Sequence, residues 1–398
     1  MHHVTSRPVP RLLSAMVVLA AVASLAACGS NNGGTGVNTG SITVSTATTG
    51  ADVDSSGYSV VVDNASGKSL GITDSLTISA VRAGSHQVSL ASVGSNCSVA
   101  PSDTQTVTVA SGAATAVSFQ VTCVLREIVF SSFPTDSGDI FTINDDGTGS
   151  HGLAPSTSFD GLPSWSPNGQ LIAFSSSRQH AGHGFDIWTV KPDNSGLTRV
   201  TTLAGENGLP AWSPDGGKIA YASTRTDSAV GHAEIWVMNA DGSNQLQLTH
   251  DDALANAPAW SPDGTQIAYQ SNAGGTTQIW IVNADGSNAH KLTSDQSNDA
   301  SPSWSTAGIV FQSDRDRSDA DTAQVEVYVM KSDGTGQTRL TNSPGFDGTP
   351  AWSSDGKKIV FESARSGHSD VWVMNADGSN QSRVTSNGAE NGTPKFKP

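Results

Sequence analysis

The sequence is poor in charge and in helix-forming pattern. Asp, Glu, Lys and Arg make up 14% of its 398 residues, against about a quarter in ordinary globular proteins. No stretch after residue 30 repeats apolar residues at intervals of three and four, as an amphipathic helix requires. Gly, Ser, Thr and Asn are abundant instead, and these residues favour turns and pleated strands. The sequence therefore predicts an all-β fold.

Basic residues and catalytic signatures are also scarce. The formal net charge is −15, and no cluster of Lys and Arg follows the N-terminal segment. A nucleic-acid binder needs a basic face that neutralises phosphates, so nucleic acid is excluded as a partner. The chain contains neither a G-x-S-x-G nor an H-E-x-x-H motif. These absences favour binding over catalysis, and we assign no catalytic residue.

Cysteine is rare, and the first of the three cysteines lies in a targeting signal. Arg7 and Arg11 precede an apolar run, residues 12–27, which is too short for a comfortable membrane span. The run ends in Leu-Ala-Ala-Cys, which resembles a bacterial lipobox with Cys28 as the lipidated residue. We expect a signal peptide over residues 1–27 and a flexible tether over 28–40. The protein would then be lipid-anchored in the cell envelope, on an outer membrane, facing the periplasm or the cell surface.

The other two cysteines lie in a stretch of short alternating strands, residues 41–124. In an exported chain, Cys97 and Cys123 predict a disulfide. Turn residues separate the strands at spacings of about ten, as in a small β-sandwich. Residues 84–90 resemble a strand of PEGA-like or carboxypeptidase-regulatory-like modules, which implies a spacer. Because only Val124 and Leu125 join this domain to the next strand, we expect it to be docked rigidly.

The remaining residues, 125–398, repeat a Pro-x-Trp-Ser-Pro-Asp-Gly pattern. Its tryptophans lie 44 to 48 residues apart, at positions 165, 212, 260, 304 and 352. An Asp-Gly hairpin turn recurs at Asp146, Asp241, Asp285, Asp333 and Asp377, and a period of this length is typical of four-stranded propeller blades. The first repeat lacks its Trp strand, and residues 392–396 match that strand, with Phe396 at the Trp position. The sequence predicts a six-bladed β-propeller that the C-terminal strand closes.

Two motifs of the repeat, P-x-W-S-P-D-G and I-x-V-M-N-A-D-G-S-N, resemble the propeller of TolB and its relatives. The resemblance implies a six-bladed envelope propeller that serves as a binding scaffold. TolB has an α/β N-terminal domain, where this chain has a β-module, so the chain resembles the family rather than TolB itself. Three alternatives remain open: a lyase- or peptidase-like propeller enzyme, a carbohydrate- or metal-binding protein, and a structural spacer.

Candidate binding residues lie on the loops that vary in length between repeats, which share one face, here called the variable-loop face. We expect the propeller to be monomeric and to bind a protein partner from the envelope on this face, through half-exposed aromatic residues. We also expect an acidic ring at the channel mouth, which can hold a basic peptide or a divalent cation. No other cofactor is expected. These candidates are Phe133, Phe159, Phe185 and Phe346, with Asp160, Glu206, Asp299, Asp347 and Glu390.

Three further repeat features have mainly structural interpretations. A weak metal-site candidate combines His183, His232 and His368. All nine tryptophans fall at repeat positions, and we expect them in the core between blades. Arginines that end the second strands, such as Arg178 and Arg365, should pair with acids that open the third strands, such as Asp186 and Asp370.

Overall fold

The computed structural model describes residues 38–398, apart from 54–55, 134–136, 180–183, 203–204, 226–231, 251–252 and 318–323. The predicted signal peptide and Cys28 lie outside the described residues. Every regular element within them is a strand, which confirms the all-β prediction. The described part of the chain accordingly contains no helix that could cross a membrane.

Eight strands form the N-terminal region in two sheets, with strand orders β4-β1-β8-β6 and β3-β2-β5-β7. The two sheets share one apolar cluster, in which Ile42, Val60 and Phe119 are fully buried. The strands are β1 (Thr39–Gly50), β2 (Tyr58–Val62), β3 (Lys68–Leu70), β4 (Ser75–Arg82), β5 (Gly84–Ala91), β6 (Cys97–Ala100), β7 (Thr104–Val109) and β8 (Ala114–Cys123).

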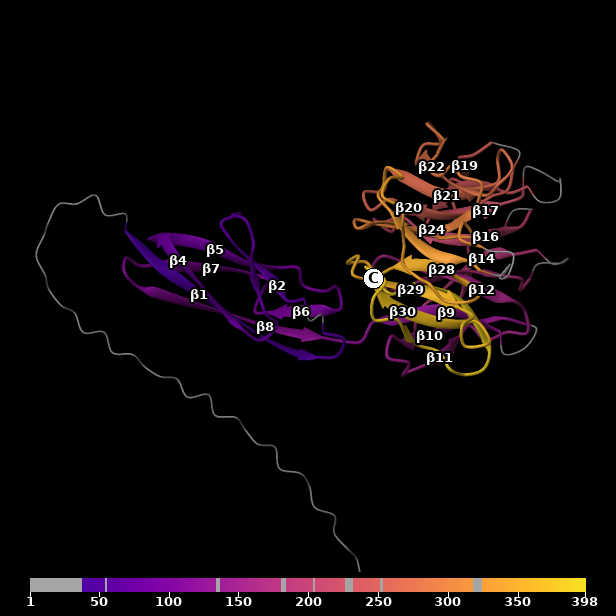
Figure 1. Cartoon of the computed structure of the whole chain (residues 1–398). Coiled ribbons are helices and arrows are strands. Elements are labelled where there is room, and N and C mark those ends of the chain that lie inside the picture. Colours follow the sequence, from indigo (N-terminus) through magenta and orange to yellow (C-terminus); the bar gives the residue numbers. More distant parts are fainter. Residues whose placement is uncertain are drawn as a thin grey trace, which may run out of the picture.

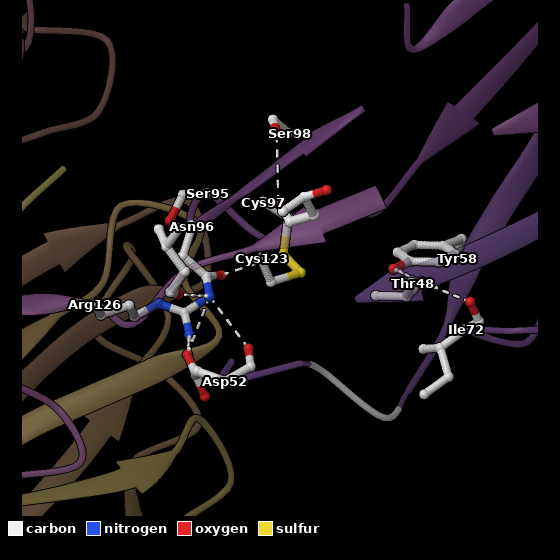
Figure 2. The surroundings of a disulfide bond; sticks show 12 residues. Thr48, Asp52, Tyr58, Ile72, Ser95, Asn96, Cys97, Ser98, Cys123 and Arg126 are labelled. Atoms are coloured by element: carbon white, nitrogen blue, oxygen red, sulfur yellow. Dashed lines mark hydrogen bonds and ion pairs between the residues drawn. A yellow bond between two sulfur atoms is a disulfide. The ribbon is translucent and has the colours of Figure 1, made fainter. Parts of the chain in front are cut away.

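The predicted disulfide is present at the end of this region. β6 pairs with β8 so that Cys97 lies opposite Cys123, and the two sulfurs are bonded. Figure 2 shows this bond close to Asn96, whose side-chain amide donates to the carbonyl of Val124 at 2.7 Å. The cross-link therefore holds the last N-terminal strand immediately before the chain enters the next sheet.

Six four-stranded sheets follow, and we number them 1 to 6. Sheets 2 to 6 each use four consecutive strands, whereas sheet 1 combines β9, β10 and β11 with the final strand, β32. The first strands are β32 (Glu390–Phe396), β12 (Asp160–Trp165), β16 (Asn207–Trp212), β20 (Ala255–Trp260), β24 (Asp299–Ser305) and β28 (Asp347–Trp352). The second strands are β9 (Glu127–Phe133), β13 (Ile172–Ser176), β17 (Lys218–Ser223), β21 (Gln266–Ser271), β25 (Gly308–Ser313) and β29 (Lys358–Ser363).

The outer half of each sheet is formed by a longer third strand and a very short fourth strand. The third strands are β10 (Asp139–Asn144), β14 (Asp186–Val190), β18 (Glu234–Asn239), β22 (Gln278–Asn283), β26 (Glu326–Met330) and β30 (Asp370–Asn375). The fourth strands are β11 (His151–Leu153), β15 (Thr198–Arg199), β19 (Leu246–Gln247), β23 (His290–Lys291), β27 (Thr338–Arg339) and β31 (Ser382–Arg383).

The apolar core lies between the sheets rather than within one centre. One buried cluster occupies the space between each pair of neighbouring sheets, and sheets 6 and 1 share one as well. In that last cluster, Phe396 and Ile128 of sheet 1 contact Val360 of sheet 6. β32 is antiparallel to β9, with Phe396 opposite Ile128. The C-terminal residues thus complete the first sheet, as the sequence predicts.

The proline of each repeat explains the shape of the first strands. Proline has no N–H for the ladder, so it is tolerated in a strand only at an edge or at an irregularity. The register shifts around this proline in all six first strands. The residue before it has a left-handed φ of 45 to 56° in each case, at Leu162, Leu209, Ala257, Ser301, Thr349 and Thr393. Each first strand therefore bends at the same point and presents the proline on its free edge.

The N-terminal sheets contact sheet 6 through a buried arginine. Arg126 donates to the carboxylates of Asp52 and Asp355, the latter at 2.8 Å (Figure 2 shows Arg126 beside Asp52). Asp355 Oδ1 accepts from Ser353 within its own turn, while Oδ2 accepts from the Ser95 amide at 3.1 Å. These contacts hold the N-terminal sheets at one side of the propeller (Figure 1), in agreement with the docked arrangement expected from the short join.

One carboxyl group at this junction, that of Asp145, lies where its charged form is disfavoured. Burial, together with the neighbouring carboxyl of Asp52, raises the pKa of Asp145 to about 6, although Arg126 acts in the opposite direction. Folding thus favours the protonated form. The contribution of Asp145 to the free energy of unfolding is greatest below the usual pKa of 3.8 and is lost as the pH rises through about 6.

We predict that Asp145→Asn removes this loss in the free energy of unfolding at higher pH. The variant should be more stable than the parent at pH 7, by roughly 1 kcal/mol after allowance for solvent screening, and no more stable at pH 4. Urea unfolding at both pH values measures the difference. Asp146→Asn, which changes the exposed neighbour, is the control and should show no such gain at pH 7. An equal gain for Asp145→Asn at both pH values would contradict the assignment.

Candidate functional site

The six sheets present two different ends to solvent. Each first strand begins at the variable-loop face, and all but β32 end at a short turn, which is nearly constant in length except in sheet 5, so the opposite end is called here the constant-turn face. In sheet 6, β28 runs from Asp347 to Trp352, and the turn at Asp355 follows. The N-terminal sheets contact this turn. The variable-loop face of sheet 6 is consequently the end remote from the N-terminal sheets.

Three of the four predicted phenylalanines form a row on the variable-loop face. The ring centres of Phe133 and Phe159 are 5.9 Å apart, and those of Phe159 and Phe185 are 5.0 Å apart in an edge-to-face arrangement. All three side chains are half-buried. They come from the end of β9, the start of β12 and the start of β14, so the row joins sheets 1 and 2.

Phe346 lies apart from this row, on sheet 6. Phe159 and Phe346 occupy equivalent positions of their repeats, because each immediately precedes the first residue of a first strand. Both rings cover a glycine of their own strand. A methyl group on Gly161 would lie 2.7 Å from Phe159 Cζ, and one on Gly348 would lie 2.3 Å from Phe346 Cζ. One face of each ring therefore packs locally.

The five predicted acids occupy two different positions of the repeat. Asp160, Asp299 and Asp347 are the first residues of first strands and are fully buried. Glu206 and Glu390 stand one residue earlier, at the position of Phe159, and are exposed. A shift of one residue turns a strand side chain to the opposite side. The predicted ring of five carboxylates at the channel mouth is therefore wrong for the three aspartates, and Glu206 and Glu390 belong to the rim.

The buried aspartates pair with the arginines that end the second strands. Arg178 binds Asp160, Arg315 binds Asp299 at 2.9 Å, and Arg365 binds Asp347 at 2.8 Å. Burial nevertheless raises the pKa of Asp299, although Arg315 acts against that shift. In sheet 4 the corresponding residues are Ala255 and Ala273, so this sheet lacks both charges.

The acids that open the third strands have other partners than predicted. Asp370 pairs with Arg383 of the fourth strand at 2.7 Å and accepts from Thr385 Oγ1 at 2.9 Å. The same arrangement joins Asp186 to Arg199, and Glu326 to Arg339. The expected pairing of Arg178 with Asp186 and of Arg365 with Asp370 is consequently wrong. Each of these sheets has two separate charge pairs, one between the first and second strands and one between the third and fourth.

The predicted histidine site is not assembled among the described residues. His183 lies outside them, and His232 and His368 belong to sheets 3 and 6, which are not neighbours. No group of three or more His, Cys, Asp or Glu within the described part of the chain is arranged to hold a metal ion.

The centre of the ring contains a candidate site that was not predicted from the sequence. The bends of the six first strands enclose a cavity of about 80 Å³, lined mainly by their prolines and by the left-handed residues. Lys395 of β32 lines this cavity and also a wider funnel that opens on the constant-turn face. The signal was present in the repeat: the residue after the proline is Ser or Ala in the other five first strands and Lys only in β32.

Four tryptophans line the funnel, and two of them are only half-buried. Trp212 and Trp304 keep part of their surface exposed, while Trp260 and Trp352 are buried. The expectation that all nine tryptophans serve only as core is therefore incomplete. The two cavities give the propeller a second candidate site, opposite the variable-loop face.

We predict that Asp299→Ala lowers the free energy of unfolding by about 1–3 kcal/mol, because Arg315 loses its buried partner and keeps only the more exposed Asp295, at 3.2 Å. The double variant Asp299→Ala/Arg315→Ala reproduces the residues of sheet 4 and should recover much of this loss. Glu206→Gln, at the exposed rim, should change stability by less than about 0.5 kcal/mol. Chemical denaturation measures all three, and a double variant less stable than the single one would refute the pairing.

The comparisons with known proteins agree with this geometry. The family described as TolB beta propeller domain matches residues 187–320 and 317–398, which together exceed half of the chain. No curated protein matches the sequence. TolB from Acinetobacter baumannii has a TM-score of 0.59 at 21% identity, over 69% of this chain and 67% of that one. A TolB candidate from Agrobacterium tumefaciens has a TM-score of 0.53 at 20% identity, over 66% and 89%. A chain of a nidogen/laminin complex has a TM-score of 0.54 at 11% identity, over 69% and 98%. The chain belongs to the TolB-like β-propeller family.

Proposed function

We propose that this chain is a non-catalytic lipoprotein of the cell envelope whose propeller holds a protein partner on its variable-loop face. In this proposal residues 1–27 are a signal peptide, Cys28 carries the lipid, and residues 28–40 are the tether. Residues 41–124 are a small sandwich-like domain, and residues 125–398 are a monomeric six-bladed propeller that β32 closes. The observation that carries the proposal is the row of Phe133, Phe159 and Phe185.

The row has the properties of a binding anchor. Aromatic rings contribute a large contact area at low cost in side-chain entropy, and they dominate the energetics of many interfaces. The rings stand at strand ends, so the sheets hold them in place before a partner arrives. Their half-buried state leaves apolar surface to be covered, and this favours a partner that inserts apolar side chains between the rings.

Two exposed acids of the rim indicate what surrounds that apolar contact. Glu390 lies opposite Phe133 in the pairing of β32 with β9, and Glu206 stands at the equivalent rim position of sheet 3. Both therefore flank the row. Carboxylates at the edge of an interface mainly steer a basic partner and set its register. The partner we propose thus has an apolar centre with Lys or Arg beside it.

The position of the N-terminal sheets supports this choice of face. Arg126, Ser95 and Lys357 join them to the constant-turn face of sheet 6, where Lys357 Nζ donates to the carbonyl of Ser92 at 2.8 Å. The N-terminal sheets, which follow the proposed lipid anchor in the chain, lie on this side of the propeller (Figure 1). The variable-loop face would then point away from the membrane, toward a partner.

Site-specific photo-crosslinking in the native cell tests the proposal. A photoreactive residue at Phe159 or at Phe346 should capture one protein, with Phe159 giving the stronger product because it lies within the row. Asn244, in a constant turn, is the control position and should capture none. Capture of the same protein from Asn244, or of no protein from either phenylalanine, would overturn the assignment of the variable-loop face.

A further inference from the structure

The centre of the propeller is an unusually apolar channel. Prolines contribute no N–H to its wall. The amides of the left-handed residues beside them point to the neighbouring sheet. The Leu162 amide donates to Ser131 Oγ at 2.9 Å, and the Thr349 amide donates to Gln312 Oε1 at 2.8 Å. Most backbone donors of the wall are thus already used between the sheets, and few remain for a polar ligand.

A single ammonium group stands in this channel. The residue after the proline is small in five first strands, namely Ser164, Ala211, Ala259, Ser303 and Ala351, and only β32 has a long side chain there, Lys395. No side chain among the described residues forms a hydrogen bond or ion pair with its Nζ. No side-chain carboxylate lines either the cavity or the funnel, although the terminal residue Pro398 borders the funnel.

An uncompensated ammonium in such surroundings is costly. Burial lowers the pKa of Lys395 to about 8, so most molecules carry the charge at neutral pH at the expense of stability. The five other sheets have Ser or Ala at this position, so packing of the ring does not require a lysine. Groups with such shifted pKa values occur more often at functional sites than elsewhere.

The funnel determines what kind of anion fits. It has a volume of about 430 Å³, and Trp and Pro line it together with several Ser and Thr side chains. Trp212 and Trp304 offer exposed ring surface on either side of the path to Lys395. The site combines one ammonium group and several Ser and Thr hydroxyls with Trp and Pro surfaces, so it suits a ligand that has both an anionic group and an apolar surface. A ligand with one carboxylate and an apolar body meets both conditions.

We propose that the channel of the propeller binds a small organic carboxylate, with the ammonium of Lys395 as the counter-charge and the funnel of tryptophans and prolines around its apolar body. This site lies on the face opposite the row of Phe133, Phe159 and Phe185. It does not depend on the protein partner proposed for that face.

Benzoate is a suitable probe because it combines one carboxylate with a flat apolar ring. Titration of the mature chain, followed by calorimetry and by tryptophan fluorescence, should show one benzoate bound per chain. Benzamide, which has the same shape without the charge, should bind at least tenfold more weakly. This comparison needs no variant. Absence of benzoate binding, or equal binding of benzamide, would overturn the proposal.

Variants then identify the counter-charge. Lys395→Met keeps the length of the side chain and should weaken benzoate binding at least tenfold. Its melting temperature at pH 7 should equal or exceed that of the parent, because a partly desolvated charge without a side-chain partner is removed. Lys291→Met is the matched control: this lysine lies over Trp280 on the outer strands of sheet 4 and should leave binding unchanged. A structural lysine would give the opposite pattern, a lower melting temperature for Lys395→Met with benzoate binding intact, and that result would overturn the assignment.

Discussion

The propeller depends on one non-local contact, the antiparallel pairing of β32 with β9. The two strands are separated by almost the whole propeller sequence, yet they place Phe396 in the same cluster as Ile128 and Val360. Without this pairing, sheet 1 would lose its first strand and sheet 6 one of its two neighbours. The channel would also lose one wall, because β32 contributes Thr393 and Lys395 to its lining. The positions of the residues at both faces of the ring therefore depend on its closure by β32.

Within the closed ring, charge is compensated locally and sheet by sheet. Asp299 with Arg315, and Asp347 with Arg365, satisfy each other beneath the variable-loop face. The sheet interior therefore contributes little net charge to that face, where exposed residues such as Glu206 and the phenylalanine row set the binding character. The channel is the exception to this rule, because no side-chain carboxylate lines it beside Lys395. The two candidate sites thus differ in kind: one is a surface that suits a macromolecule, and the other is a cavity that suits a small anion.

Much of the fold could be predicted because the repeat is local. The Pro-x-Trp pattern, the Asp-Gly turns and the match of residues 392–396 to the missing strand predicted the sheets and the closure, and two cysteines in a chain expected to be exported predicted the disulfide. The site was harder to predict. Asp160 and Glu206 look alike in the sequence, yet one residue of register buries the first and exposes the second. Arg178 lies nearer to Asp186 than to Asp160 in the chain, and only the three-dimensional arrangement of the strands shows that Asp160 is its partner. Lys395 was not predicted as a site residue, because residues 392–396 were interpreted only as the closing strand and Lys395 was not compared with Ser164 and its equivalents.

Hydrogen exchange of the mature chain tests the closure most directly. If the pairing of β32 with β9 holds the ring together, the amides that β32 donates to β9 exchange only on global unfolding, as slowly as those of β13 and β17 in the interior of the ring. Fast exchange across Glu390–Phe396, while the other sheets stay protected, would contradict this account. It would show that the ring is stable without its final strand. The positions of the residues at its two faces would then not depend on closure by β32.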